Sequence, residues 1–220
     1  MYTLRTVSML VALAAGSTAL AGPVINLAPG QQTDELTGIS NSEFTEILGD
    51  VIAEQQIEFE IRTRSAGLLY EGTLVASIVR SYSTGNLNFN YQIMDTNDSL
   101  SGVVSYVDIT GFRGLETRVE YSENEESSET EGPGGALRSI DGDILSYQFE
   151  DGLSTGLETN AFFALVDTNT FIEYGSLATI YLESGHSVGL VVHGAGAAVP
   201  APGSLALLGG AGLLAGRRRR

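Results

Sequence analysis

The chain has 220 residues, enough for one domain with a substantial core, and it contains neither cysteine nor tryptophan. The lack of cysteine excludes disulfides and thiolate metal sites. All eleven basic residues are arginines, and five lie in the two terminal segments. The part between them carries six arginines against 27 acidic residues, a formal charge of −21. Such a surface repels phosphate backbones, so we expect no nucleic-acid partner.

Residues 1–21 have the pattern of a secretory signal peptide. One basic residue, Arg5, precedes an apolar stretch from Val7 to Ala15, which is shorter than the ~20 residues that a membrane span needs. The segment closes on Ala19 and Ala21, which form the small-x-small pattern that signal peptidase accepts. We therefore predict an exported protein that is cleaved after Ala21. An uncleaved membrane anchor is the alternative.

Residues 22–50 form an irregular lead-in to the domain. The pattern from Ser40 to Glu43 fits a helix capping box, and apolar residues follow at helical spacing. One short helix over about Ser42–Leu48 is therefore expected, ended by Gly49.

From residue 51 the hydrophobic period changes to two, which is typical of strands with one buried face and one solvent face. Three of the expected strands, those that begin at Thr73, Val103 and Ala161, are apolar almost throughout and are expected to be central or bulged. The expected strands are Ile57–Arg62, Thr73–Val79, Leu87–Ile93, Val103–Ile109, Leu115–Tyr121, Leu145–Glu150, Ala161–Val166, Ala178–Glu183 and Val188–Val192.

These segments predict an all-β fold, an antiparallel β-sandwich of about nine strands over residues 51–194. An up-and-down barrel is the alternative, but polar outward faces and the lack of a pattern for a channel favour the sandwich. In the strand from Leu115, alternation places Glu116, Arg118 and Glu120 on the solvent face. The acidic run Ser122–Gly135 is expected to be a surface loop, and Asp151 with Gly152 a turn.

The sequence contains the residue pattern of a serine hydrolase. Gly152–Gly156 matches G-x-S-x-G around Ser154, and Asp167 followed by His186 or His193 completes the hydrolase order. The mechanism needs the serine on a turn from a strand to a helix, and no helix is expected here. We therefore expect an ordinary loop and a protein that is not an enzyme, with a secreted serine hydrolase as a third alternative.

Two expected turns contain several Asp and Asn side chains whose oxygen atoms could bind a metal ion, but no metal or other cofactor is expected. Neither turn matches the twelve-residue calcium loop, and Asp and Asn are common in turns for other reasons, although calcium remains an alternative. The two histidines lack the further ligand cluster that a metal site would require. The turn residues are Asp95, Asn97 and Asp98 in the first turn, and Asp141 and Asp143 in the second.

Sugar-binding sandwiches present exposed aromatic rings as stacking platforms. Without tryptophan, this role would fall to Tyr82, Tyr91 and Tyr174. Alternation places Tyr91 on the same face as Leu87 and Phe89, so Tyr91 is expected in the core. A glycan-binding module is therefore the second hypothesis for the domain.

The C-terminal segment has three parts. Residues 195–203 are a linker, residues 204–216 are apolar or small, and a basic cluster follows. The thirteen residues 204–216 would span about 20 Å as a helix, short of the ~30 Å hydrocarbon core. The basic cluster would hold its end on the cytoplasmic side, and a simple membrane anchor is the alternative. The linker contains the motif Val199, Pro200, Ala201, Pro202 and Gly203, and the basic cluster is Arg217, Arg218, Arg219 and Arg220.

This segment, Val199 to Arg220, resembles the PEP-CTERM sorting signals of bacterial exported proteins. In that family a Pro-Glu-Pro-like motif precedes a short membrane segment and an arginine cluster, and here Ala201 stands in place of the glutamate. The resemblance implies a transient membrane anchor, cleavage by an exosortase-like protease near Pro200 to Gly203, and delivery to the cell surface, outer envelope or extracellular matrix of a bacterium. It covers a tenth of the chain and does not specify the role of the domain.

The leading hypothesis is a non-enzymatic exported protein with a structural or adhesive role at the cell surface or in the extracellular matrix. Its expected partners are signal peptidase, the exosortase-like protease, the membrane transiently through 204–216, and extracellular polysaccharide. A glycan- or calcium-binding module on the same fold is the alternative.

Overall fold

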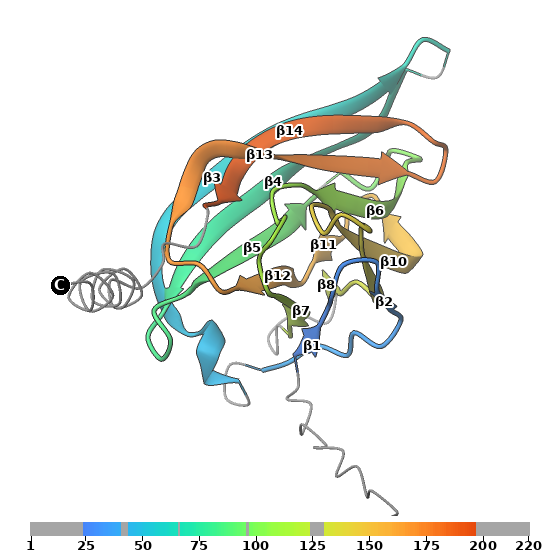
Figure 1. Cartoon of the computed structure of the whole chain (residues 1–220). Coiled ribbons are helices and arrows are strands. Elements are labelled where there is room, and N and C mark those ends of the chain that lie inside the picture. The colour runs from blue at the N-terminus through green and yellow to red at the C-terminus, as the bar shows by residue number, and fades with distance from the viewer. Residues whose placement is uncertain (1–23, 41–43, 66, 96, 124–129, 197–220) are drawn as a thin grey trace, which may run out of the picture.

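The structure is a computed structural model, and it describes residues 24–40, 44–65, 67–95, 97–123 and 130–196 (Figure 1). Several sequence predictions fall outside these residues. They are the signal segment with Ala19 and Ala21, the beginning of the expected helix at Ser42, the motif Val199–Gly203, the apolar segment 204–216 with its expected helix, and the cluster Arg217–Arg220.

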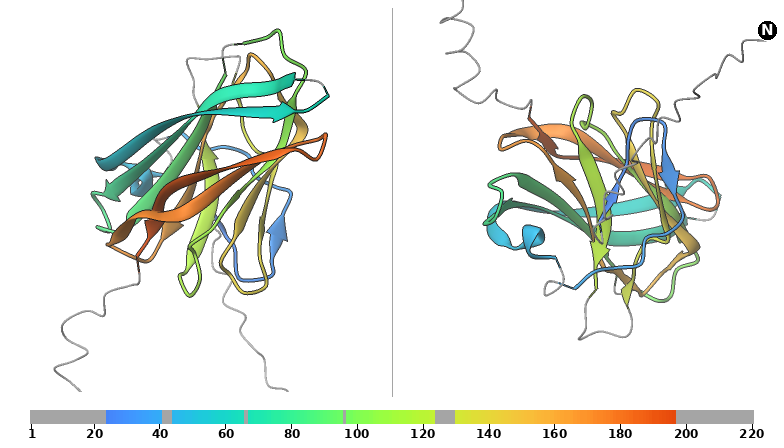
Figure 2. Two further views of the ribbon diagram at one scale, coloured as in Figure 1. Left: turned by 90° about the horizontal axis from the view of Figure 1, so that it is seen from above. Right: turned by 60° about the horizontal axis from the view of Figure 1, so that its bottom comes forward.

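Two six-stranded sheets pack face to face (Figures 1 and 2). Neighbouring strands within both sheets are antiparallel. Sheet A contains, in spatial order, β1 (Ile25–Asn26), β7 (Thr117–Ser122), β12 (Ala161–Val166), β5 (Leu87–Met94), β4 (Gly67–Ser81) and β3 (Gly49–Thr63). Sheet B contains β14 (Ser187–Ala195), β13 (Phe171–Leu182), β6 (Val103–Ile109), β10 (Leu145–Ser154), β9 (Gly135–Arg138) and β2 (Gln32–Thr33). A small parallel pair joins β8 (Thr130–Glu131) to β11 (Glu158–Thr159).

The prediction of an antiparallel β-sandwich of about nine strands is confirmed. Nine of the strands in the described residues have six residues or more, and each corresponds to one expected segment. The other strands are only two to four residues long. Such short pairings show no period of two, so the sequence pattern could not indicate them.

The lead-in and the acidic run contribute to the sheets. β1 lies at the edge of sheet A and β2 at the edge of sheet B, so the chain crosses between the sheets before the first long strand. β3 begins at Gly49. β8 lies within the run 122–135 that was expected to be a loop, and β9 begins at the last residue of that run.

The expected short helix is replaced, in its described part, by one 3-10 turn, η1 (Thr45–Ile47). Phe44 precedes it without a side-chain capping hydrogen bond. Leu48 is already extended, and its carbonyl accepts a hydrogen bond from the N–H of Tyr82. The helix therefore cannot continue to Leu48, because that residue is held beside the end of β4.

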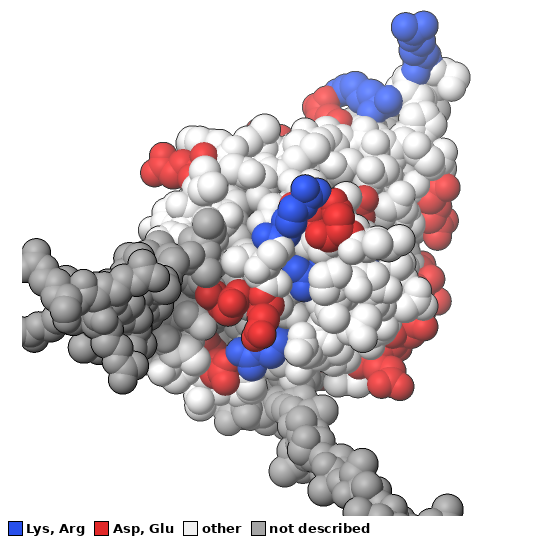
Figure 3. Space-filling view, in the orientation of Figure 1, with Lys and Arg blue, Asp and Glu red and all other residues white. Residues whose placement is uncertain are grey.

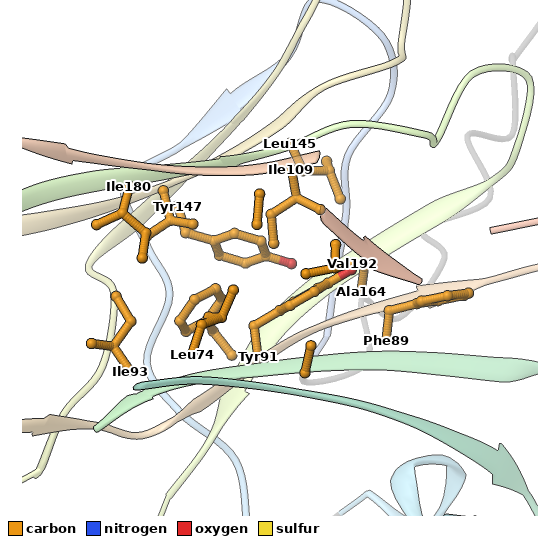
Figure 4. Close-up of a cluster of buried hydrophobic side chains, with 14 of the residues drawn as sticks. Leu74, Phe89, Tyr91, Ile93, Ile109, Leu145, Tyr147, Ala164, Ile180 and Val192 are labelled. Carbon is orange, nitrogen blue, oxygen red and sulfur yellow. The ribbon is translucent and has the colours of Figure 1, made fainter. Parts of the chain in front are cut away.

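The core lies between the two sheets and is formed by their inward-facing side chains (Figure 4). The Tyr147 hydroxyl donates to the carbonyl of Phe163 across 2.7 Å, which fixes sheet B against the central strand of sheet A. Tyr91 lies in the same core, and its hydroxyl has no hydrogen-bond partner there. The side chains that Figure 4 labels are Leu74, Phe89, Tyr91, Ile93, Ile109, Leu145, Tyr147, Ala164, Ile180 and Val192.

A second, smaller core lies on the outer side of sheet A. Phe163 and Leu165 of β12 pack there against Val24 and Ile39, with Phe44 partly buried beside them. β12 is therefore buried on both faces, which explains its continuous apolar sequence.

Glu120 was expected to face solvent, and this prediction is wrong. Its side chain is 0% exposed, because the segment around Gly38 and Ile39 covers this side of β7. Its Oε1 accepts the N–H groups of Gly38 and Tyr121, whereas Oε2 has no partner among the described residues. Burial raises the pKa of the Glu120 carboxyl above its ordinary value, although its main-chain hydrogen bonds oppose the rise.

The expected turn at Asp151 and Gly152 is also wrong. Both residues lie inside β10, where the pairing with β6 shifts register between Gln148 and Leu153. Gly152 has a φ of +68° there, a conformation that favours glycine. A glycine in a bulge and a glycine in a turn give the same local sequence pattern.

Candidate ligand-binding surface

Ser154 is the last residue of β10, is exposed, and pairs with Val103 of the neighbouring strand. A turn follows it, and β11 comes next in the chain. The residues around Ser154 therefore do not form the turn from a strand to a helix that a nucleophilic serine requires.

The other residues of the hydrolase pattern make separate contacts. Asp167 accepts the main-chain N–H of Glu116, and His186 lies 3.2 Å from the hydroxyl of Ser184 in a hairpin turn. His193 contacts the aromatic residues at the other end of β14. Within the described parts of the chain, no hydrogen bond joins Ser154, Asp167 and a histidine.

The oxygen atoms of the two candidate calcium turns stabilise the turns themselves. Asp95 accepts the N–H groups of Asn97 and Gly156, across 2.7 and 3.1 Å. Asp141 accepts from the Ser139 hydroxyl and pairs with Arg113. These are the usual roles of Asp in turns. Within residues 24–196, less the gaps already given, no group of three or more His, Asp or Glu side chains is arranged to hold a metal ion.

A hollow of about 690 Å³ opens beside β3, β4 and the end of β5. Four carboxylates line it, but Glu71 accepts a hydrogen bond from Asn97, and Glu60 pairs with Arg62. The hollow is therefore an acidic depression in which two of the four carboxylates are already engaged with neighbouring side chains. The four carboxylates are those of Glu58, Glu60, Glu71 and Asp95.

The outer side of the β13–β14 hairpin has a different character. Glu173 is the single charged residue in the sequences of these two strands. Leu177 and Val191 face each other across the hairpin and are 41% and 52% exposed. Figure 3 shows charged side chains scattered over this view of the molecule, with a mostly uncharged surface over β13 and β14. We call this outer side the β13–β14 face, comprising Tyr174, Leu177, Thr179, Tyr181, Val191 and His193.

Two tyrosines stack at one end of this face. The rings of Tyr106 and Tyr181 lie 4.3 Å apart between centroids and are nearly parallel, at 16°. Both alternate with residues buried in the core, so they project outward. The same outer side continues onto β10, where Gln148 pairs with Tyr106.

A polar row lies beside the tyrosine pair. Asp108 of β6 pairs in register with Thr179 on one side and with Ser146 on the other. The Ser146 hydroxyl donates to the Asp108 carboxylate. Partial burial raises the pKa of Asp108, and this hydrogen bond opposes the rise. Hydrogen-bonding groups thus lie next to the half-buried, outward-facing tyrosine pair.

Tyr174 and His193 form a second aromatic group at the other end of the face. Tyr174 is 64% exposed and adopts a φ of +55°, which is uncommon for a residue with a side chain. Its N–H donates to Nδ1 of His193 across 3.4 Å, and the two rings lie 5.4 Å apart. The His193 N–H donates to the side-chain carbonyl of Gln55 in β3 across 2.9 Å. Figures 1 and 2 show this hairpin beside the β3–β4 hairpin.

Of the three tyrosines considered from the sequence, Tyr91 is buried as predicted, whereas Tyr82 and Tyr174 are exposed. The sequence reasoning missed Tyr106 and Tyr181. A signal for Tyr181 was present, because the alternation that buries Ala178 and Ile180 places Tyr181 on the opposite face. Its stacking on Tyr106 depends on the pairing of β6 with β13, which no local pattern specifies.

No helix within the described residues is long and apolar enough to cross a membrane. Comparison of the chain with protein-family models, with curated proteins and with solved structures finds no match.

Proposed function

We propose that this protein is exported and acts without catalysis, as an adhesive or structural component of a bacterial cell surface or extracellular matrix. The N-terminal pattern with Ala19 and Ala21 supports export. The motif Val199–Gly203, the apolar residues 204–216 and the arginine cluster support transient anchoring and sorting by an exosortase-like protease.

The β13–β14 face is the observation that carries the adhesive role. In a domain with a formal charge of −21, the outer side of two neighbouring strands presents aromatic and aliphatic side chains, and these strands contain a single charged residue. Contiguous exposed apolar surface on a soluble domain marks an interaction site more often than a chance arrangement. A sheet face of this kind can hold a partner without any catalytic group.

Mass spectrometry of the protein from its native cells, combined with cell fractionation, tests export and sorting. We expect a mature form that begins at Gly22, lacks the arginine cluster, and occurs in the envelope or matrix fraction. Deletion of the gene should weaken attachment or matrix cohesion, and restoring the full-length chain should reverse this. A mature form that retains Arg220 would contradict sorting by cleavage, and a purely cytoplasmic protein would contradict the whole proposal.

A further inference from the structure

Two ring sites, one half-buried and one exposed, lie towards opposite ends of the β13–β14 face. One is Tyr181, stacked on Tyr106, and the other is Tyr174, supported by His193. Five residue steps separate Tyr181 from Ser176, about 17 Å at roughly 3.3 Å per residue. Tyr174 lies beyond Ser176, across the bulge that separates Ile172 from Ser176. Two flat apolar groups placed so far along one strand suit an extended polymer better than a single small molecule.

The two outward positions of β14 nearest Tyr181 carry small residues, and the side chain of Leu177 reaches over the second of them. The register partner of Tyr181 is Ser187, and the next outward position on β14 is Gly189, opposite Thr179. An apolar ring of a ligand could therefore lie against Tyr181 above Ser187, with the side chain of Leu177 bounding it on the side of Gly189.

Polar groups adjoin the tyrosine pair in the next row along the strands and at the end of its own row. Thr179, Asp108 and Ser146 form one row across three strands, and Gln148 extends the neighbouring row beyond Tyr106. Hydroxyl, carboxylate and amide groups are the side chains that bond sugar hydroxyls, because each can accept or donate a hydrogen bond at the edge of a sugar ring. Stacking surface next to such groups is the combination that a sugar chain requires.

We propose that the β13–β14 face, together with Tyr106, binds a neutral polysaccharide chain. Sugar rings stack on Tyr181 and Tyr174, and their hydroxyl groups bond to Thr179, Asp108 and Gln148. This inference rests on the proposed adhesive function and names the partner of that function.

The charge of the domain selects a neutral polymer among the possible partners. A polyanionic polysaccharide is repelled by a body of charge −21, and a second copy of this chain carries the same charge. A basic polymer gains nothing from a face with one charged residue, and the acidic hollow beside β3 would attract it more strongly. A neutral polysaccharide is neither repelled by the acidic domain nor attracted to the acidic hollow.

Affinity electrophoresis of the purified full-length protein tests the proposal directly. Native gels at pH 8 would contain dextran, laminarin, galactomannan or hydroxyethyl cellulose as neutral probes, and alginate or hyaluronan as acidic probes. We expect at least one neutral probe to retard the protein and both acidic probes to leave its mobility unchanged.

Variants locate the binding site. Tyr181→Ala and Tyr174→Ala should each weaken binding about fivefold or more, because buried aromatic anchors dominate such interfaces. Tyr181→Phe, which keeps the ring, should stay within about twofold of the wild type. Val191→Glu places a charge on the exposed middle of the face and should also weaken binding. The matched control is Tyr82→Ala, since Tyr82 is 71% exposed but lies outside the face.

Thermal melts confirm that each variant is folded, and analytical ultracentrifugation measures its oligomeric state. The proposal is overturned if no neutral probe binds, if Tyr82→Ala weakens binding as much as Tyr181→Ala does, or if Tyr181→Ala dissociates a dimer instead of reducing polysaccharide binding.

The binding assay uses purified protein outside the cell, so its result is independent of export. A surface-located protein that binds no neutral probe contradicts this inference alone, and a binding protein that stays in the cytoplasm contradicts the proposed function alone.

Discussion

The guanidinium of Arg138 donates to the main-chain carbonyl of Leu27, 111 positions earlier in the sequence, across 2.9 Å. The same side chain also donates to the carbonyls of Gly142, Phe112 and Leu115. Arg138 is 2% exposed, and burial lowers the pKa of its guanidinium. The buried Arg138 guanidinium therefore links the connection between β1 and β2 to the β6–β7 loop and to the β9–β10 turn by hydrogen bonds.

Arg138→Met should lower the free energy of unfolding by about 2–4 kcal/mol. It leaves the carbonyls of Leu27 and Gly142 without a donor among the described residues and removes one of two donors from those of Phe112 and Leu115. Arg138→Lys should cost less but should not restore stability, since an ammonium group cannot reproduce the planar fork. Urea denaturation measures both. Arg113→Ala is the control: Arg113 is exposed and pairs with Asp141 at the surface, so its loss should cost less than about 1 kcal/mol. Equal losses for Arg138→Met and Arg113→Ala would show that the carbonyl contacts contribute little.

Two core tyrosines should respond oppositely to loss of the hydroxyl. Tyr147→Phe should destabilise the protein by about 1–2 kcal/mol, because it removes the donor to the Phe163 carbonyl. Tyr91→Phe should be neutral or stabilising, since it removes a buried hydroxyl that has no partner in the described part of the chain. Both replacements keep the ring, so packing is matched between them. Denaturant midpoints at neutral pH measure the stability of both variants. A large loss of stability in Tyr91→Phe would contradict the conclusion that the Tyr91 hydroxyl is unpaired in the described part of the chain.

Glu120 should make the stability depend on pH. Its pKa is raised above the ordinary value of 4.5, so the folded protein holds this proton more tightly than the unfolded chain does. Its contribution to stability is therefore greatest below the ordinary pKa and is lost as pH rises through the raised pKa of the folded state. Relative to Glu120→Gln, the wild type should become progressively less stable across this window. Thermal melts of both proteins from pH 4 to 8 measure the difference, and a constant difference would contradict the assigned direction.

At position 174 the glycine variant should be more stable than the alanine variant, which reverses the usual order. The φ of +55° strains any residue with a Cβ, so Tyr174→Gly should be about 1 kcal/mol more stable than Tyr174→Ala. Both variants lack the ring, and the comparison therefore isolates the backbone. At Leu177, which has no positive φ, alanine should be the better residue. Chemical denaturation of the four variants provides the test, and the same order at both positions would show that Tyr174 is not strained.

The long strands could be predicted because each carries its own alternation. The segments around Ile57 and Leu87 alternate polar and apolar residues, and that pattern is fixed locally. Glu120 shows where this reasoning ends. Its position in the alternation is that of a solvent residue, and its burial depends on a cover supplied by the segment around Ile39, some eighty residues earlier in the chain.

The candidate surface was predictable only in part. Tyr174 was one of three tyrosines that the sequence offered as an exposed ring. Its contact with His193 requires the bulge that separates Ile172 from Ser176. The Tyr106–Tyr181 stack requires two strands that are far apart in sequence to pair in one register. Periodicity assigns a residue to a face, whereas strand order decides which faces become neighbours.

The β14 strand has a mechanical consequence. It is the last described strand, and the N–H of Gly196 just beyond it donates to the carbonyl of Thr170, just before β13. A tether attached through the residues after Gly196 would therefore pull on the same hairpin that carries the aromatic face. Tension between such a tether and a bound polymer would run along β14 and its ladder with β13, and the sandwich core would bear little of the load.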